Sequence, residues 1–315
     1  MRLLVTRPMT ARATQAIRDR FDATFRDNTP LSEAEAAAAL RDYDAIMPTL
    51  GDAFTAAAFA DQPRCRILAN FGAGYNHIDT AAAKAAGIVV TNTPDVVTDA
   101  TADIAVMLIL MTLRRASEGE RILRAGQWTG WNPTQLLGGH ATGRTLGIVG
   151  MGRIGQAIAR RCHHGFGMDV VFFNRSTVTG LDFPARQIDG LEAMLEQVDV
   201  AVLAVPGGAG TRHLIGGPQL AALGPQGYLV NIARGDVVDE AALIQALQDG
   251  VIAGAGLDVY EREPLVPQGL LDAPNATLLP HLGTATDDTR TAMALRALDN
   301  LIAFAEGRGP HDPVN

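Results

Sequence analysis

The sequence is poor in cysteine. Only Cys65 and Cys162 occur, and they lie far apart along the chain. Two isolated cysteines provide neither a disulfide framework nor the spacing of a zinc site. We therefore expect two ordinary thiols, buried or half-buried, and no bound metal.

A long apolar run is also lacking. The longest, residues 104–113, is about half of what a membrane-spanning helix needs. The first nine residues, MRLLVTRPM, contain too short an apolar segment for a signal peptide, and no small-residue cleavage site follows them. We expect a cytoplasmic protein without a membrane partner.

An excess of positive charge is absent as well. The 26 Lys and Arg residues stand against 34 Asp and Glu residues, so the formal net charge is −8. Nucleic acids and anionic membranes attract clustered basic residues, which such a balance does not supply. We expect no nucleic-acid partner, and any anionic ligand must be bound by a local group of positive charges.

What the chain does contain is a regular alternation of short apolar strands and helical patterns. Its 315 residues, 47% hydrophobic and 19% charged, are typical of a globular chain of about two domains. Alternating strands and helices predict parallel sheets covered on both faces. The first domain is expected to hold strands at 2–6, 45–48, 67–69 and 89–91 and helices at 10–21 and 32–41, the second helix opened by a capping box of Ser32 and Glu35.

From residue 99 the pattern changes. One long helix is predicted over 99–126, apolar all round at its centre and therefore buried, and a loop follows at 127–143. Six further strands are predicted at 146–149, 170–173, 200–204, 228–232, 253–257 and 277–279, and a last helix at 287–305. We predict an α/β protein of two doubly wound parallel-sheet domains, with residues 98–286 inserted between residues 1–97 and 287–315.

A glycine motif, Gly150-x-Gly152-x-x-Gly155, directly follows the strand at 146–149 and opens a helix. In this setting the motif is typical of dinucleotide binding. The first glycine permits the tight turn, the second lets the backbone approach the pyrophosphate, and the third lets helix and strand pack closely. The helix N-terminus supplies free N–H groups and the positive end of its dipole.

The turn after the next strand favours NADP over NAD. An NAD site usually carries Asp or Glu there for the ribose 2′-hydroxyl, whereas this chain has Asn174, Arg175 and Ser176. An arginine can pair with a 2′-phosphate, and the two neighbours can donate hydrogen bonds. A solvated surface arginine on an enzyme that uses either cofactor is the alternative.

Three polar residues follow the ends of successive predicted strands: Arg234, Glu263 and His281. Together they suffice for hydride transfer to a keto acid. The arginine binds a carboxylate or polarises the carbonyl, and the histidine donates a proton to the carbonyl oxygen. The glutamate orients the imidazole and favours its charged form.

At this point the chain resembles the D-isomer-specific 2-hydroxyacid dehydrogenases. The resemblance covers nearly the whole chain and is carried by LGIVGMGRIG (146–155), NIARGD (231–236), LDVYEREP (257–264), PHLGTAT (280–286), NFGAGYNHID (70–79) and AGIVVTNTP (86–94). It implies a Rossmann cofactor domain inserted into a flavodoxin-like substrate domain. It also implies that Arg234 binds substrate and that Glu263 orients the catalytic His281, which leaves Glu261 as surface charge.

The resemblance assigns further residues to the two ligands. The substrate carboxylate is expected at the backbone of Phe71, Gly72, Ala73 and Gly74, beside Leu50. Glycines at 72 and 74 would let consecutive N–H groups face an anion. Cofactor contacts are expected from Thr101, Arg153, Ile154, Val205, Pro206, Thr211, Ile232, Ala233, Asp258 and Gly283, in addition to His281 and the glycine and Asn174–Ser176 motifs.

Within the family, the stretch at 126–133 and the Asn174-Arg175-Ser176 turn are similar to the glyoxylate/hydroxypyruvate reductase branch, which tends to use NADPH. The branch implies a homodimer in which Trp128 or Trp131 reaches the partner's substrate pocket; ordinary packing of both is the alternative. The predicted function is NADPH-dependent reduction of a small 2-oxo acid, with NAD possible. A larger 2-oxo acid, or a dinucleotide-sensing corepressor-like protein, remains as an alternative.

Overall fold

The computed structural model describes all 315 residues and divides into two compact units. One consists of Met1–Val97 and Thr284–Asn315, and the other of Thr98–Gly283. The expected insertion of one α/β unit into another is therefore present. The chain returns to the first unit after Gly283, three residues before the expected boundary between residues 286 and 287.

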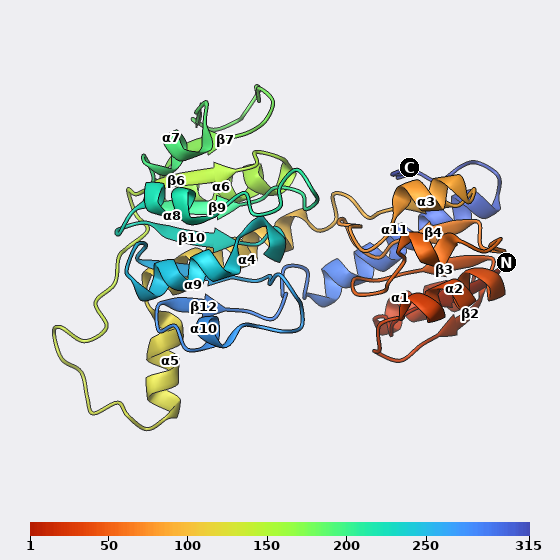
Figure 1. Ribbon diagram of the computed structural model, residues 1–315, viewed down its shortest axis with the longest axis horizontal. Coiled ribbons are helices and arrows are strands. Elements are labelled where there is room, and N and C mark those ends of the chain that lie inside the picture. The colour runs from red at the N-terminus through yellow and green to blue at the C-terminus, as the bar shows by residue number, and fades with distance from the viewer. The chain divides into compact units, whose positions relative to one another are not determined.

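The first unit is built on a five-stranded, wholly parallel sheet in the order β2-β1-β3-β4-β5 (Figure 1). The strands are β1 (Arg2–Val5), β2 (Asp22–Phe25), β3 (Ala45–Met47), β4 (Ile67–Ala69) and β5 (Val89–Thr91). The helices are α1 (Ala11–Arg18), α2 (Glu33–Asp42), the 3-10 helix η1 (Ala56–Phe59), α3 (Thr80–Ala85) and α11 (Asp287–Ala305). This is the order of flavodoxin-like sheets, as predicted.

Two apolar layers cover the sheet of the first unit. One contains Ile17 of α1 and Leu298 and Leu301 of α11, and the other contains Leu40 of α2 and Ala83 of α3. Strand β2 was not predicted, because its sequence DATF carries no apolar run and its residues are exposed or half-buried at the sheet edge. The capping box of α2 is present: Ser32 Oγ accepts from the Glu35 amide.

The second unit has a seven-stranded parallel sheet in the order β12-β11-β10-β9-β6-β7-β8. Its strands are β6 (Thr145–Val149), β7 (Asp169–Phe173), β8 (Arg186–Gln187), β9 (Val200–Leu203), β10 (Tyr228–Asn231), β11 (Gly254–Leu257) and β12 (Ala276–Leu278). Its helices are α4 (Thr98–Leu113), α5 (Ala116–Arg124), α6 (Arg153–Phe166), α7 (Leu191–Leu195), α8 (Gly217–Leu223), η2 (Gly235–Val237), α9 (Glu240–Gln248) and α10 (Gln268–Leu271). Apolar layers on both faces again make the sheet doubly wound.

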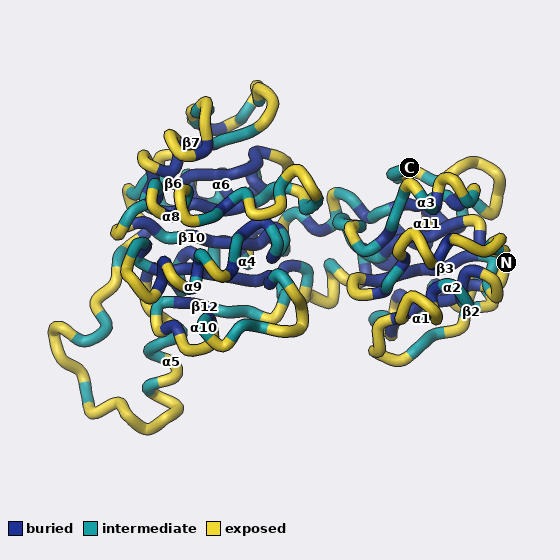
Figure 2. The backbone as a smooth tube through the Cα atoms, in the orientation of Figure 1, coloured by how far each residue is buried: buried dark blue, intermediate teal, exposed yellow.

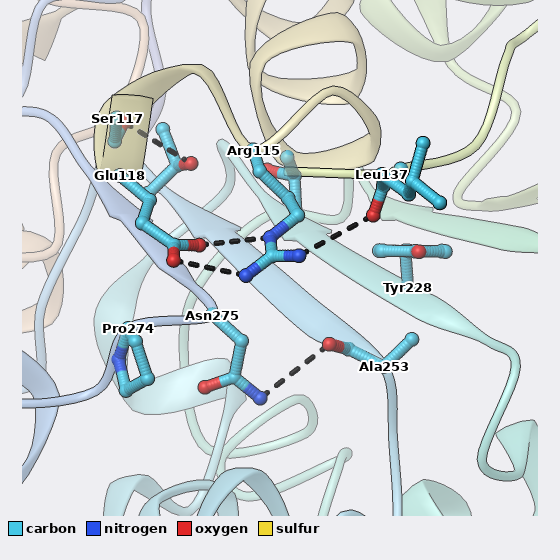
Figure 3. Close-up of a pocket in the computed structure, with 11 residues that line it drawn as sticks. Arg115, Ser117, Glu118, Leu137, Tyr228, Ala253, Pro274 and Asn275 are labelled. Carbon is cyan, nitrogen blue, oxygen red and sulfur yellow. Dashed lines mark hydrogen bonds and ion pairs between the residues drawn. The ribbon is translucent and has the colours of Figure 1, made fainter. Parts of the chain in front are cut away.

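The prediction of one helix over 99–126 is wrong, because the helix breaks into α4 and α5. Arg115 adopts a left-handed conformation with φ 51°, and the amide of Gly139 caps α4 by donating to the Leu113 carbonyl at 2.9 Å. The Arg115 guanidinium binds Glu118 at 2.8 Å (Figure 3) and also donates to the Leu137 carbonyl. The loop that carries Leu137 and Gly139 thus stabilises the break between α4 and α5. The helical pattern of residues 99–126 does not indicate this break.

These contacts border a cavity of about 270 Å³. Tyr228 and Ala253, which line it, stand at the beginnings of strands β10 and β11, so the cavity lies at the amino-terminal edge of the sheet (Figure 3). Beyond the break, α5 and the loop after it project from the unit, and most of this loop is exposed (Figure 2). No helix in the structure is both long and apolar enough to cross a membrane.

Candidate active site

The parallel register brings six strand ends of the second unit to one edge. Val149 pairs with both Phe173 and Leu203, and Leu257 pairs with both Asn231 and Leu278. The residues that follow these strands form a row: Gly150, Asn174, Ala204, Ile232, Asp258 and Leu279. The strand order reverses between β9 and β6, where ligands bind in open α/β sheets. Gly150 stands at this switch point.

The three glycines of the motif have different surroundings. Gly150 has φ 99°, and a Cβ there would lie 2.8 Å from the Ala204 carbonyl oxygen. A Cβ on Gly155 would lie 2.2 Å from the carbonyl oxygen of Gly150, so helix α6 packs directly on the turn. At Gly152 a Cβ would meet no atom within 4 Å. The turn therefore leaves open space at Gly152, beside the uncapped amides that begin α6.

The turn after β7 is tied to the glycine motif. The Asn174 Oδ1 accepts from the amide of Met151 at 3.2 Å, and the Asn174 Nδ2 donates to the carbonyl oxygen and hydroxyl of Ser176 at 2.9 and 3.2 Å. Arg175 between them is exposed and makes no side-chain hydrogen bond or ion pair in the structure. An exposed cation without a protein partner therefore stands on an ordered turn.

Glu263 and His281 form a hydrogen-bonded pair. The Glu263 Oε2 lies 2.7 Å from His281 Nδ1, and the Glu263 Oε1 accepts from the Tyr260 amide at 3.0 Å. His281 has φ 53° and its amide donates to the Asp258 carbonyl. The side chains of the pair are 28% and 32% exposed, respectively, so solvent reaches both only in part.

Arg234 is placed by the strand that precedes it. Asn231, the last residue of β10, donates to the carbonyl oxygen of Arg234 at 2.8 Å and accepts from the amide of Ala233 at 3.0 Å. Gly235 then packs on the chain at Tyr260, since a Cβ there would lie 1.8 Å from the Tyr260 carbonyl carbon. The segment that carries the arginine thus lies against the segment that carries Glu263.

The charges of these residues act on one another. Burial alone would raise the pKa of Glu263, but the hydrogen bond and charge of His281, with the Tyr260 amide and Arg234, hold it below its ordinary value. Burial lowers the pKa of Arg234, while the charges of Glu263 and Asp236 oppose that change. Arg234 and His281 therefore both act on the Glu263 carboxylate, which stays ionised near neutral pH.

Asp258 forms a second anchored carboxylate. Its two oxygens accept from the amides of Leu282 and Gly283 at 2.6 and 2.8 Å. Burial raises its pKa, although these amides and the His281 charge oppose the shift. A Cβ on Gly283 would lie 3.3 Å from Asp258 and 3.7 Å from Thr101, so these three predicted cofactor residues meet.

The expectation that Glu261 is merely surface charge is wrong. Its carboxylate binds His213 Nε2 at 2.6 Å and Arg212 at 3.5 Å, and its amide donates to the buried Glu240 at 2.8 Å. Glu261 thereby links the segment after β9 to the segment that carries Glu263. Its distant partners, about fifty residues earlier, give no local signal in the sequence.

The segment after β9 carries three predicted cofactor residues. Thr211 closes it by donating to the Pro206 carbonyl at 2.7 Å, and Val205 contacts the glycine turn, since its Cγ1 would lie 2.9 Å from a Cβ on Gly150. Ile232 and Ala233 are buried beyond β10, and Arg153 and Ile154 form the first turn of α6. All of these residues lie along the carboxyl edge of the sheet.

In the first unit, two asparagines organise the Phe71–Gly74 loop. The Asn70 Nδ2 donates to the carbonyl oxygens of Gly72 and Gly74, each at 3.0 Å, and the Asn92 Nδ2 donates to that of Ala73 at 2.8 Å. The amides of Phe71 and Gly72 donate to Pro48 and Asn70. Those of Ala73 and Gly74 donate to no acceptor in this unit, which leaves two adjacent donors.

The remaining predicted substrate residues are exposed. Leu50 is 45% exposed, and Trp128 and Trp131 are 53% and 81% exposed. The indole of Trp128 donates only to Gln135 of its own loop, at 3.3 Å. Neither tryptophan is buried in the core of its unit.

Residues 106–283 match the family described as D-isomer specific 2-hydroxyacid dehydrogenase, NAD binding domain. The chain belongs to this family. A glyoxylate reductase from Thermococcus onnurineus is 41% identical over 320 residues, covering 100% of this chain and 96% of the relative.

Two solved structures are similar over nearly their full length. A Thermus thermophilus protein described as TT0316 has a TM-score of 0.92 and 39% identity, covering 100% of both chains. An NADPH-dependent glyoxylate/hydroxypyruvate reductase from Sinorhizobium meliloti, in complex with NADP and malonate, has a TM-score of 0.88 and 41% identity, covering 99% of this chain and 96% of that one. The family resemblance and the two-domain α/β fold expected from the sequence are confirmed, and the chain is an oxidoreductase of this family.

Proposed function

We propose that the chain reduces glyoxylate or hydroxypyruvate to the 2-hydroxy acid with NADPH. The Glu263–His281 pair at 2.7 Å, within the field of Arg234, carries this proposal. Because Nδ1 is held by the carboxylate, Nε2 is left to donate a proton to the carbonyl oxygen of the substrate. A nicotinamide cofactor held at the Gly150–Gly155 turn would supply the hydride. His281 then regains its proton from water.

The substrate carboxylate has two sets of candidate donors. In the first unit the amides of Ala73 and Gly74 have no acceptor, whereas the carbonyls of residues 72–74 are already bound. In the second unit Arg234 offers a guanidinium. The names of the similar proteins from Thermococcus onnurineus and Sinorhizobium meliloti support a small 2-oxo acid.

The cofactor residues fit an adenine dinucleotide phosphate. No carboxylate occupies the turn after β7, and the exposed cation of Arg175 is available for a 2′-phosphate. Replacing Arg175 with Ala should raise KM for NADPH about tenfold, because one charge-assisted contact to phosphate is lost. KM for NADH should change little. Arg186→Ala, an exposed arginine on β8, is the matched control.

We also propose a homodimer formed through α5 and the following loop. Helix α5 buries none of its residues, and Leu123, Trp131 and Leu137 expose 61%, 81% and 65% of their surface. Exposed apolar side chains on a projecting segment are typical of a subunit interface. Light scattering should give twice the chain mass, and Trp131→Ala should change substrate preference more than cofactor preference if the tryptophan reaches the partner's substrate.

Steady-state rates with glyoxylate, hydroxypyruvate, pyruvate and phenylpyruvate, each with NADPH and NADH, test the whole proposal. The highest kcat/KM is expected for glyoxylate or hydroxypyruvate with NADPH. A maximum at phenylpyruvate would instead assign the chain to larger 2-oxo acids, and cofactor binding without turnover would favour a dinucleotide sensor.

Both cysteines are buried and unpaired, which suits the reducing cytoplasm, where we propose that the enzyme acts.

A further inference from the structure

The turn that carries Arg175 is held from outside by one side chain. Gln187 lies on β8, a two-residue strand at the sheet edge that pairs Gln187 with Phe172 of β7. This register places Gln187 two residues short of Asn174, where the turn begins. Its amide group can therefore reach past the end of β7 into the turn.

Gln187 uses both ends of its amide group there. The Nε2 donates to the carbonyl oxygens of Asn174 at 3.2 Å and Ser176 at 3.1 Å, and the Oε1 accepts from the Val178 amide at 3.1 Å. The two carbonyls flank Arg175 on either side. The backbone at Arg175 is thus fixed by a side chain that never contacts the guanidinium.

The same contacts prepare the donors of the turn. The Ser176 Oγ accepts from Asn174 Nδ2 at 3.2 Å, so its own hydrogen remains free to be donated. Arg175 remains exposed without a protein partner. A turn that is ordered before binding loses less conformational entropy when an anion arrives.

We propose that Gln187 is a specificity-determining positioning residue, which selects the 2′-phosphate of NADP by holding the Asn174–Ser176 turn in its binding conformation. The inference rests on the proposed NADPH preference and names a residue outside the turn that enforces it. Its ligand class is a ribose 2′-phosphate monoester. Gln187 acts only through the residues it holds.

The experiment compares two nucleotide fragments that lack nicotinamide, 2′,5′-ADP and 5′-AMP, by titration calorimetry on the full-length protein. Gln187→Met keeps the side-chain length and removes all three hydrogen bonds. It should raise Kd for 2′,5′-ADP about five- to tenfold, which is about the worth of one of the three lost bonds, because these bonds order the turn and do not contact the ligand. Kd for 5′-AMP should change less than about twofold. The ratio of kcat/KM for NADPH to that for NADH should fall by a similar factor.

A second variant and a control distinguish an effect on the Asn174–Ser176 turn from a general loss of protein stability. Gln187→Glu can still accept from Val178 but repels both flanking carbonyls and the phosphate, so it should lose more affinity for 2′,5′-ADP than Gln187→Met. Gln197→Met alters an exposed glutamine bound to Arg186 and Ala193, and should leave both fragments at wild-type affinity. Melting curves verify that each variant is folded.

Three outcomes are distinguishable. A selective loss of 2′,5′-ADP affinity supports the inference. Equal losses for both fragments, or none, overturn it, because a merely structural glutamine would not discriminate between them. A wild-type protein that binds 5′-AMP as tightly as 2′,5′-ADP contradicts the NADPH preference itself, whatever the variants do.

Discussion

Replacing Glu263 with Gln should reduce kcat/KM for 2-oxo acid reduction by about 10- to 150-fold at neutral pH. The amide can still accept from Tyr260, so the main loss is the charge-assisted bond to His281 at 2.7 Å, together with the carboxylate charge near Arg234. Such a bond contributes about 1.5–3 kcal/mol to the stability of the transition state. About 1.36 kcal/mol corresponds to a tenfold change in rate. The partial exposure of the pair, 28% and 32%, favours the lower half of this range.

The assay is steady-state oxidation of NADPH by glyoxylate, followed from acid to alkaline pH. In wild type the pKa of Glu263 is lowered, so its carboxylate is ionised throughout the neutral range. The negative charge is lost only as the pH falls below 4.5, the ordinary pKa of a glutamate. In the variant there is no carboxylate to protonate, so this loss of activity in acid should be absent. The control is Glu261→Gln, which removes a carboxylate two residues away that binds His213 and not His281. It should lower kcat/KM less than about threefold. A Glu263→Gln enzyme with the rate and pH profile of wild type would refute the role given to this pair.

Three further outcomes are expected. His281→Ala should lower kcat by about 10²- to 10⁴-fold while Kd for NADPH, measured by fluorescence, stays near wild type; undiminished turnover would exclude the histidine as acid. Gly155→Ala should weaken cofactor binding and destabilise the protein by about 1–3 kcal/mol, because its Cβ would lie 2.2 Å from the Gly150 oxygen, whereas Gly165→Ala in the same helix meets no atom within 4 Å and should not. Asp312→Asn should cost about 1–3 kcal/mol in urea unfolding at pH 7, since Arg296 and Asn300 oppose the effect of burial and hold the Asp312 pKa below its ordinary value. That contribution is present above pH 3.8, the ordinary value, and disappears as the pH falls through the lower folded-state pKa, so the two proteins should converge in acid.

Much of the fold could be predicted because buried parallel strands appear in the sequence as continuous apolar runs. Strands β4 and β5 and helix α11 have the bounds expected from the sequence. The edge strands β2 and β8 could not be found, because an edge strand needs no apolar run and β8 has only two residues.

The break between α4 and α5 was missed for a different reason. It depends on Gly139 capping the Leu113 carbonyl, and these residues lie twenty-six positions apart. Local helical propensity continues through the break, so only the tertiary contact ends the helix.

The candidate site shows the same division. Arg234, Glu263 and His281 follow strands whose ends the sheet aligns, so their type and position could be predicted from the pattern. The residues that hold them could not. Asn231 acts through backbone atoms of the arginine segment, and His213 through Glu261, 48 positions further along the chain. A supporting polar residue carries no motif of its own.

The way in which Asn70 and Asn92 restrain the carbonyls of the Phe71–Gly74 loop has a consequence for how substrate range can change. In this loop an acid group would be recognised by main-chain donors, the amides of Ala73 and Gly74. Substitution at Phe71 or Ala73 can then resize the space for the variable end of a 2-oxo acid without disturbing its common end. Loss of either asparagine, by contrast, should weaken the binding of every 2-oxo acid alike.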